Sequence, residues 1–270
     1  DGVVYPDKEM AINPGQVFGA IEGVEAKDPT FGLDTVWIEA SQREEAQSLG
    51  YTVVDAGTVI ATHISQLLKD HAHEFLGHDE VQQLLDTLAK ASPKLVESLV
   101  PDLLSLGTVL RVMQNLLQEG IPVRDMRTIA EALAETAVTS QDPDTLTGLV
   151  RIALSRTIYQ QINGLESELE VLSLEPTLEQ MLQDAIRGTQ QSVGLEPGLA
   201  EQMLRQITEG VTRLESEGKP AVLLVTSTLR LWLARLVRTN NKSLHVLAYD
   251  EIPAEKRVRV IATIGNQVEQ

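Results

Sequence analysis

Cysteine is absent from the 270-residue sequence, which excludes disulfide bonds, thiol nucleophiles and cysteine-ligated zinc. A chain without cysteine is also typical of a reducing compartment. Aromatic residues are scarce, at 3%, so leucine, valine, isoleucine and alanine must supply the hydrophobic cores. Basic residues are outnumbered, 22 against 39 acidic ones, and the net charge of −17 repels phosphate backbones and anionic lipids. We therefore expect neither a nucleic-acid partner nor direct binding to a membrane surface.

Long apolar runs are also absent, since none approaches the roughly 18 residues that span a bilayer. The N-terminus, Asp1-Gly2-Val3, lacks an initiator methionine and the charged-then-apolar pattern of a secretory signal. The run Val3-Val4-Tyr5 is apolar and β-branched and predicts a strand. We therefore expect the chain to be a fragment of a longer protein that begins within a domain.

Short strands and turns are predicted for residues 1–55. Turn signals occur at Asn13-Pro14-Gly15 and at 28–32, where Pro29 keeps the residue before it out of the helical region. Strands predicted at 36–38 and 51–54 flank a short helix at 43–49. A strand, a helix and a strand in so few residues indicate a small α/β subdomain.

The pattern changes to helices between residues 57 and 163. Apolar residues recur there at i, i+3, i+4 and i+7, which places them on one face of a helix. Helices with a single apolar face pack on one another, so this region predicts a compact bundle or a superhelical stack. The apolar faces are formed by Val81, Leu84, Leu85 and Leu88; by Val109, Val112, Met113, Leu116 and Leu117; by Met126, Ile129, Ala130, Leu133 and Ala134; and by Leu146, Leu149, Val150, Ala153, Leu154 and Ile158.

The C-terminal third alternates between strands and helices. Strands are predicted at 169–174, 221–225, 244–247 and 258–264, and helices at 177–186, 199–214 and 229–237, with a linker at 188–198. This alternation indicates a sheet flanked by helices. The sequence as a whole therefore predicts an α+β protein of several subdomains: a small α/β part, a central helical part and a C-terminal α/β part.

Four of the five histidines lie close together in the sequence, which raises the alternative of a metal-dependent hydrolase. His63, His71, His73 and His78 are separated by 8, 2 and 5 positions. Two ligands on one helix need a separation of three or four positions to share a face, so this spacing favours a solvated polar surface. No phosphate-binding loop or serine nucleophile motif occurs either, and we expect no catalytic residue, cofactor or metal.

Phe31 is one of three phenylalanines and lies in a predicted turn, where a large aromatic side chain is unexpected. One interpretation is that it fills the core of the small subdomain. The other is that it belongs to an exposed apolar patch for a partner.

Several short motifs occur in order along nearly the whole chain. They are Ala11-Ile12-Asn13-Pro14-Gly15, Asp28-Pro29-Thr30-Phe31-Gly32-Leu33, Trp37-Ile38, Gly50-Tyr51-Thr52-Val53-Val54-Asp55, Val59-Ile60-Ala61-Thr62-His63, Leu99-Val100-Pro101, Val112-Met113-Gln114-Asn115-Leu116-Leu117, Ile121-Pro122-Val123-Arg124-Asp125-Met126-Arg127, Leu154-Ser155-Arg156, Gly194-Leu195-Glu196-Pro197-Gly198-Leu199 and Ala262-Thr263-Ile264-Gly265. Together these motifs resemble the export gate family of flagella and the related injectisomes. The runs at 28–33 and Thr62-His63 favour the flagellar branch, and the injectisome counterpart is kept as an alternative.

The resemblance implies a protein whose N-terminal half spans the bacterial inner membrane and whose C-terminal half forms a homo-oligomeric ring on the cytoplasmic face. It also implies four subdomains with a superhelical middle. In this chain, residues 1–6 and 56–75 would be a remnant of the first, 7–55 the small α/β subdomain, 76–155 the helical one and 156–270 the C-terminal one.

The resemblance further implies a hydrophobic dimple that binds flagellar export chaperones carrying late substrates, and with it a docking platform that orders their delivery to the export channel. A switch protein and the ATPase complex of the export apparatus are the other implied partners. The matching residues are Asp28, Phe31 and Thr62 at the centre of the dimple and Ile12, Pro14, Leu33, Val54 and Val59 around it.

Overall fold

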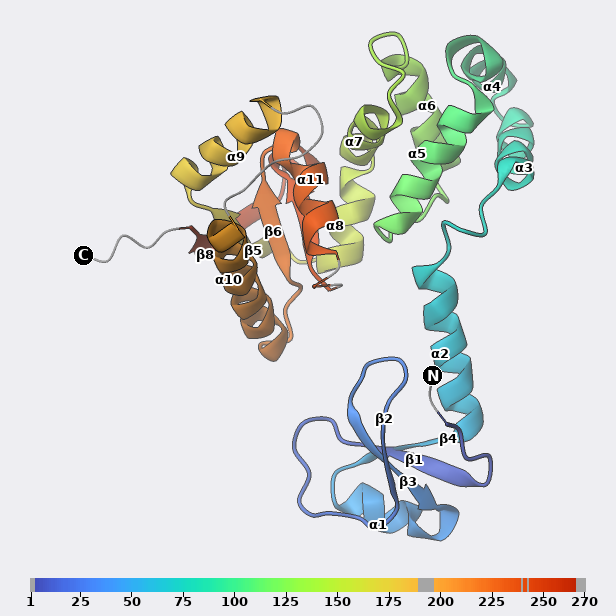
Figure 1. The fold of residues 1–270 in the computed structure, drawn as a ribbon. Coiled ribbons are helices and arrows are strands. Elements are labelled where there is room, and N and C mark those ends of the chain that lie inside the picture. The colour runs from blue at the N-terminus through green and yellow to red at the C-terminus, as the bar shows by residue number, and fades with distance from the viewer. Residues whose placement is uncertain (1–2, 189–196, 239, 242, 266–270) are drawn as a thin grey trace. The chain divides into compact units, whose positions relative to one another are not determined.

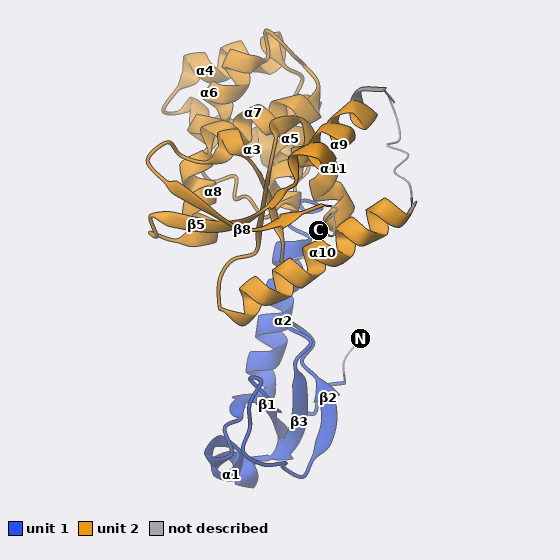
Figure 2. Cartoon of the chain, turned by 90° about the vertical axis from the view of Figure 1, so that its left-hand side faces the viewer, with its two compact units in different colours: residues 1–75 blue, residues 76–270 orange. Residues whose placement is uncertain are grey.

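The computed structural model describes residues 3–188, 197–238, 240–241 and 243–265 and divides into two compact units, residues 1–75 and 76–270 (Figure 2). A four-stranded antiparallel sheet organises the first unit (Figure 1). Its strand order is β2-β3-β1-β4, so β1 lies inside the sheet and pairs with both β3 and β4. The elements of this unit are β1 (Lys8–Ile12), β2 (Val24–Lys27), β3 (Asp34–Glu39), a short 3-10 turn (Ala40–Gln42), α1 (Arg43–Ser48), β4 (Thr52–Asp55) and α2 (Ala56–Asp70).

Both faces of this sheet are partly covered, because successive side chains of a strand point to opposite sides. Met10 and Trp37 pack on one face with Ala56 and Val59 from the start of α2. Ala11 and Ile38, the next residue along each strand, pack on the other face with Ala46 of α1. The sheet therefore has an α2 face and an α1 face.

The strand predicted at Val3-Val4-Tyr5 is wrong, because these residues are irregular and the first strand begins at Lys8. Pro6 follows directly and has no N–H to donate to a ladder. Tyr5 instead lies edge-on to the Trp37 ring, with the ring centroids 5.7 Å apart. The segment thus closes over the α2 face without joining the sheet.

The helices of the second unit follow the predicted apolar faces closely. Three of them begin at a side-chain cap, where Ser105, Asp125 or Asp142 accepts a hydrogen bond from a backbone N–H three residues later. Val81, Val112, Leu116, Ile129 and Leu146 are all fully buried in one core. The helices are α3 (His78–Ala89), α4 (Pro93–Glu97), a π-helical segment (Ser98–Leu103), α5 (Leu106–Gln118), α6 (Met126–Thr136), α7 (Pro143–Ala153) and α8 (Ser155–Asn163).

A parallel four-stranded sheet with the order β7-β6-β5-β8 forms the rest of this unit. Its elements are β5 (Glu168–Leu174), α9 (Pro176–Gly188), α10 (Pro197–Ser216), β6 (Val222–Val225), α11 (Ser227–Val237), β7 (His245–Ala248), a 3-10 turn (Tyr249–Glu251) and β8 (Arg257–Ile264). Leu223 and Val225 face α9, α10 and α11, whereas Val222 and Leu224 face the helical part. The helical part and the sheet therefore share one continuous core.

The predicted strands and helices of the second unit are confirmed to within a few residues. The predicted linker at 188–198 lies mostly outside the described residues, although Gly188 and Pro197 each belong to a helix. The assignment of residues 1–270 to four subdomains stays a prediction.

Leu116 tests whether the predicted apolar faces form the stability core. Its side chain is fully buried on α5, so we expect Leu116→Ala to lower the free energy of unfolding by about 2–5 kcal/mol. Arg111→Ala, at an exposed position of the same helix, is the matched control and should change it by less than about 0.5 kcal/mol. Chemical denaturation measures both, and a similar small loss for the two variants would show that Leu116 does not support the core.

Candidate functional site

A six-residue turn between β2 and β3 carries three of the predicted site residues, Asp28, Phe31 and Leu33. The Asp28 carboxylate accepts hydrogen bonds from the N–H groups of Thr30 and Phe31, at 3.1 and 2.5 Å. The Asp28 N–H donates to the carbonyl of Leu33 at 2.8 Å, and its own carbonyl accepts from Gly32 at 2.9 Å. Asp28 is thereby 94% buried, and the turn is closed on both sides.

Phe31 projects from this turn with 67% of its surface exposed, and Leu33 is exposed to 41%. The interpretation of Phe31 as a plug of the subdomain core is therefore wrong. A ring held out on a closed turn presents apolar area without much loss of backbone freedom on binding. The ring is therefore accessible to another molecule.

The remaining predicted residues lie on the neighbouring elements of the same unit. Ile12 on β1 and Val54 on β4 are partly buried against the α2-face cluster, to which Val59 of α2 belongs. Pro14 is exposed just beyond β1, and Thr62 is exposed on α2, three positions after Val59. The structure thus brings Ile12, Val54 and Val59 into one cluster and Asp28, Phe31 and Leu33 into one turn.

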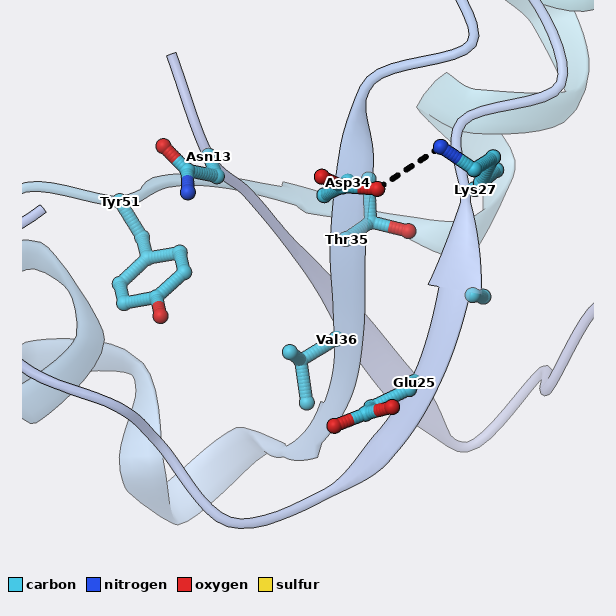
Figure 3. Close-up of a pocket in the computed structure, with 8 residues that line it drawn as sticks. Asn13, Glu25, Lys27, Asp34, Thr35, Val36 and Tyr51 are labelled. Atoms are coloured by element: carbon cyan, nitrogen blue, oxygen red, sulfur yellow. Dashed lines mark hydrogen bonds and ion pairs between the residues drawn. The ribbon is translucent and has the colours of Figure 1, made fainter. Parts of the chain in front are cut away.

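A hollow of about 510 Å³, which the sequence did not predict, lies over β2 and β3 (Figure 3). Lys27 and Asp34 form an ion pair at its rim, with 2.9 Å between Nζ and Oδ1. Because Glu25 pairs with Val36 and Lys27 with Asp34, these side chains share the α1 face. The hollow is lined by Asn13, Glu25, Ala26, Lys27, Asp34, Thr35, Val36 and Tyr51. It therefore opens on the opposite side of the sheet from the cluster of Ile12, Val54 and Val59.

The four histidines are divided between the two units. His71 lies 2.8 Å from the carboxylate of Glu74 and His73 lies 3.8 Å from it, whereas His63 is on α2 and His78 begins α3 in the other unit. Within the described ranges, no group of three or more histidine, aspartate or glutamate side chains is placed to hold a metal ion. The hydrolase alternative therefore has no ligand set in this part of the chain.

A buried cluster of four charges lies in the second unit, where α5, α7 and α11 meet the turn after β7. Arg151 donates two hydrogen bonds to Glu251, at 2.7 and 2.6 Å, and a third to Glu119 at 2.9 Å. Arg230 donates to Glu119 as well and lies 3.7 Å from Glu251. Glu251, Arg151 and Arg230 are each at most 3% exposed. We call this set the buried charge cluster.

The pKa shifts of Glu119 and Arg151 both favour the ionised forms of these two side chains. Burial raises the pKa of Glu119, but Arg151 and Arg230 beside it outweigh this and hold the pKa below its usual value. Burial lowers the pKa of Arg151, but the hydrogen bonds and the charge of Glu251 raise it by more. The pKa of Arg151 therefore lies above its usual value. Each charge is thus offset by a partner.

Glu251→Ala should be severely destabilising, because it leaves the Arg151 guanidinium buried without its bidentate partner. We expect a loss of about 3–5 kcal/mol in the free energy of unfolding. Glu255→Ala is the matched control, since that carboxylate pairs with Arg156 on an exposed surface and should contribute less than about 1 kcal/mol. Equal effects of the two variants in chemical denaturation would contradict the importance of the buried charge cluster.

His245 gives the second unit a predictable dependence on pH. Burial lowers its pKa below the usual 6.5, and the nearby Arg151 cation lowers it further. Between the folded-state pKa and 6.5, the unfolded chain binds a proton at His245 that the native state does not bind. The contribution of His245 to stability is therefore complete above pH 6.5 and is lost as the pH falls through this range. The slope is at most about 1.4 kcal/mol per pH unit.

We expect His245→Gln to remove this contribution, so that the unfolding free energies of the variant and the unsubstituted chain diverge between pH 7.5 and 5.5. Urea titrations at several pH values measure the difference. Parallel curves for the two proteins would contradict the assignment.

None of the helices in the described portion of the chain combines the length and apolar character needed to cross a membrane.

Comparison with known proteins decides the family. The FHIPEP family matches residues 1–257. The chain belongs to this family. Flagellar biosynthesis protein FlhA of Escherichia coli (strain K12) is 46% identical over 266 residues, which cover 98% of this chain and 38% of that protein. FlhA of Bacillus subtilis (strain 168) is 34% identical, over 97% of this chain and 39% of that protein.

Solved structures of related folds match nearly all of the chain. The Chlamydia pneumoniae CdsV protein has a TM-score of 0.79 at 25% identity, over 98% of this chain and 76% of that one. CdsV in a complex with CdsO has a TM-score of 0.83. The nonameric EPEC SctV-C shares the fold, with a TM-score of 0.76 at 23% identity. This chain spans about 38% of the length of the curated FlhA relatives that it matches.

Proposed function

We propose that this chain is a docking platform of a flagellar type III export gate, which binds export chaperones with their substrates and orders their delivery to the export channel. Relatives named for flagellar biosynthesis, at 34–46% identity, support the flagellar branch. The solved structures are more distant, at 21–25% identity, and one of them is the EscV cytosolic domain from the type III secretion system, which keeps the injectisome counterpart as the alternative.

The observation that carries this proposal is the exposed ring of Phe31 on a closed turn. Leu33, exposed beside it, adds apolar area, and the apolar cluster of Ile12, Val54 and Val59 lies on the α2 face of the same sheet. Such a surface suits an apolar anchor from a helical partner, which lays one apolar stripe against it. Thr62 and Pro14 complete the proposed site from α2 and from the segment after β1.

The α2 helix supports the further proposal that residues 56–75 belong to a subdomain with additional chain. Ala56 and Val59 of this helix are buried, but Ile60, Ile64, Leu67 and Leu68 form an apolar stripe with each side chain 43–52% exposed. The related CdsV structure extends beyond the matched region, since this chain covers 76% of it. Residues that correspond to this additional part of CdsV would cover the apolar stripe of α2 in the longer protein.

Location and assembly follow from the same relationship. We infer that the longer protein is anchored in the inner membrane with this part on the cytoplasmic face, and that it assembles into a ring. The nonameric assemblies of SctV-C and of the EscV cytosolic domain support the ring. The complex of CdsV with CdsO supports the proposal that the longer protein has further protein partners, for which we propose a switch protein and the ATPase complex of the export apparatus.

Phe31→Ala tests the proposed site. If Phe31 is the anchor, its removal should weaken the binding of a flagellar export chaperone by at least about tenfold, equivalent to about 1.4 kcal/mol or more. Because the ring is mostly exposed, the melting temperature should stay close to that of the unsubstituted chain. Thr62→Met should give a smaller loss, because the larger side chain would fill part of the proposed dimple.

Phe18→Ala is the matched control, because Phe18 is 88% exposed in the same unit and lies outside the proposed site. Calorimetric titration of the chaperone into each folded variant measures the effect. Normal affinity for Phe31→Ala, or an equal loss for Phe18→Ala, would refute the docking site.

A further inference from the structure

The Asp28 carboxylate faces into the turn and not toward solvent. A carboxylate at the edge of a docking surface would ordinarily be assigned a direct polar contact with the partner. Here its Oδ2 atom already accepts the N–H groups of Thr30 and Phe31, and 6% of the residue's surface is exposed. Little of the carboxylate is left for a partner to reach.

We infer that Asp28 is a positioning residue, which fixes the backbone of Phe31 and so presents the ring, and that it makes no essential contact with the partner itself. This inference rests on the proposed function of Phe31 as an anchor. Its physical basis is that one side-chain oxygen of Asp28 accepts the backbone N–H groups of both Thr30 and Phe31, which holds the centre of the turn in one conformation. The bond is made at the N–H of the residue whose side chain must be presented.

Other residues of the turn also restrict its backbone. Pro29 restricts the backbone after Asp28, and Gly32 adopts a φ of 69°, a left-handed conformation that other residues enter at a cost. The pairing of the Asp28 N–H with the Leu33 carbonyl closes the turn onto β2 and β3. With its ends fixed by the sheet and its centre fixed by the Asp28 carboxylate, the turn loses little freedom when a partner binds Phe31.

An asparagine side chain separates positioning from direct contact, because its amide oxygen can accept the same two N–H groups without a negative charge. We expect Asp28→Ala to weaken chaperone binding by about five- to tenfold, through loss of the preorganised turn. Asp28→Asn should restore binding to within about twofold of the unsubstituted chain, since the turn is remade. Asp34→Asn is the control for charge, because Asp34 lies beside the turn and pairs with Lys27 on the α1 face.

Amide hydrogen exchange tests the inference without any partner. The Phe31 N–H should exchange at least about tenfold faster in Asp28→Ala than in the unsubstituted chain, and Asp28→Asn should recover most of the protection. The amides of β1 and β3 serve as the internal control, since they should keep their protection if the sheet remains folded.

Two results would overturn the inference. One is a loss of chaperone binding in Asp28→Asn as large as in Asp28→Ala while the Phe31 amide stays protected, because the charge would then contact the partner. The other is an unchanged Phe31 amide in Asp28→Ala. If Phe31→Ala binds normally, the proposed docking site fails, and the exchange rates alone then decide whether Asp28 positions the turn.

Discussion

The pairing of β1 with both of its neighbours is the constraint on which the first unit depends. Met10 lies opposite Trp37 and Val54, whereas Ala11 lies opposite Val36 and Val53. A slip of one residue would exchange the two faces of the strand and dismantle both apolar clusters at once. The same register sets Ile12 against Thr35, two residues beyond Leu33. The sheet therefore places the end of β1 next to the strand that follows the Phe31 turn before any partner arrives.

The second unit depends on a parallel sheet whose two faces are both buried. The buried charge cluster lies where α5, α7 and α11 meet the turn after β7. Burying two arginines and two glutamates costs desolvation free energy that their mutual attraction offsets only when every partner is present. In the buried charge cluster each partner comes from a different element, so a displaced α7 or α11 would leave a charge without its counterpart. Such a displacement would therefore cost the free energy of burying an uncompensated charge.

Much of the fold could be predicted from the sequence because its helices and strands follow from the local spacing of apolar residues. The apolar faces of α5 and α6 and the continuous apolar run of β6 each require only neighbouring residues to be recognised. The buried charge cluster could not be predicted in this way. Arg151 and Glu251 are 100 positions apart and Glu119 and Arg230 are 111 apart, and in the sequence they look like any surface charges.

The candidate site shows the same division. The position of Phe31 in a turn could be predicted from Pro29 and Gly32, but its exposure could not, because that depends on which side chains fill the sheet faces. Tyr5 and Met10 cover Trp37 on the α2 face and leave Phe31 outside. The inward orientation of Asp28 depends on the hydrogen bonds of the closed turn. The hollow lined by Glu25, Val36 and Tyr51 depends on the register of β2 against β3, which local patterns do not determine.

The central claim is that a chaperone binds at the Phe31 turn and the α2 face of the sheet. The most direct measurement is a titration of isotope-labelled chain with an export chaperone carrying its substrate, followed residue by residue by backbone amide NMR signals. The account predicts that the largest changes occur at residues 28–33, at Ile12 and at the start of α2, while Glu25, Val36 and Tyr51 around the hollow on the α1 face change little. Changes centred on the hollow, or confined to the second unit, would contradict it.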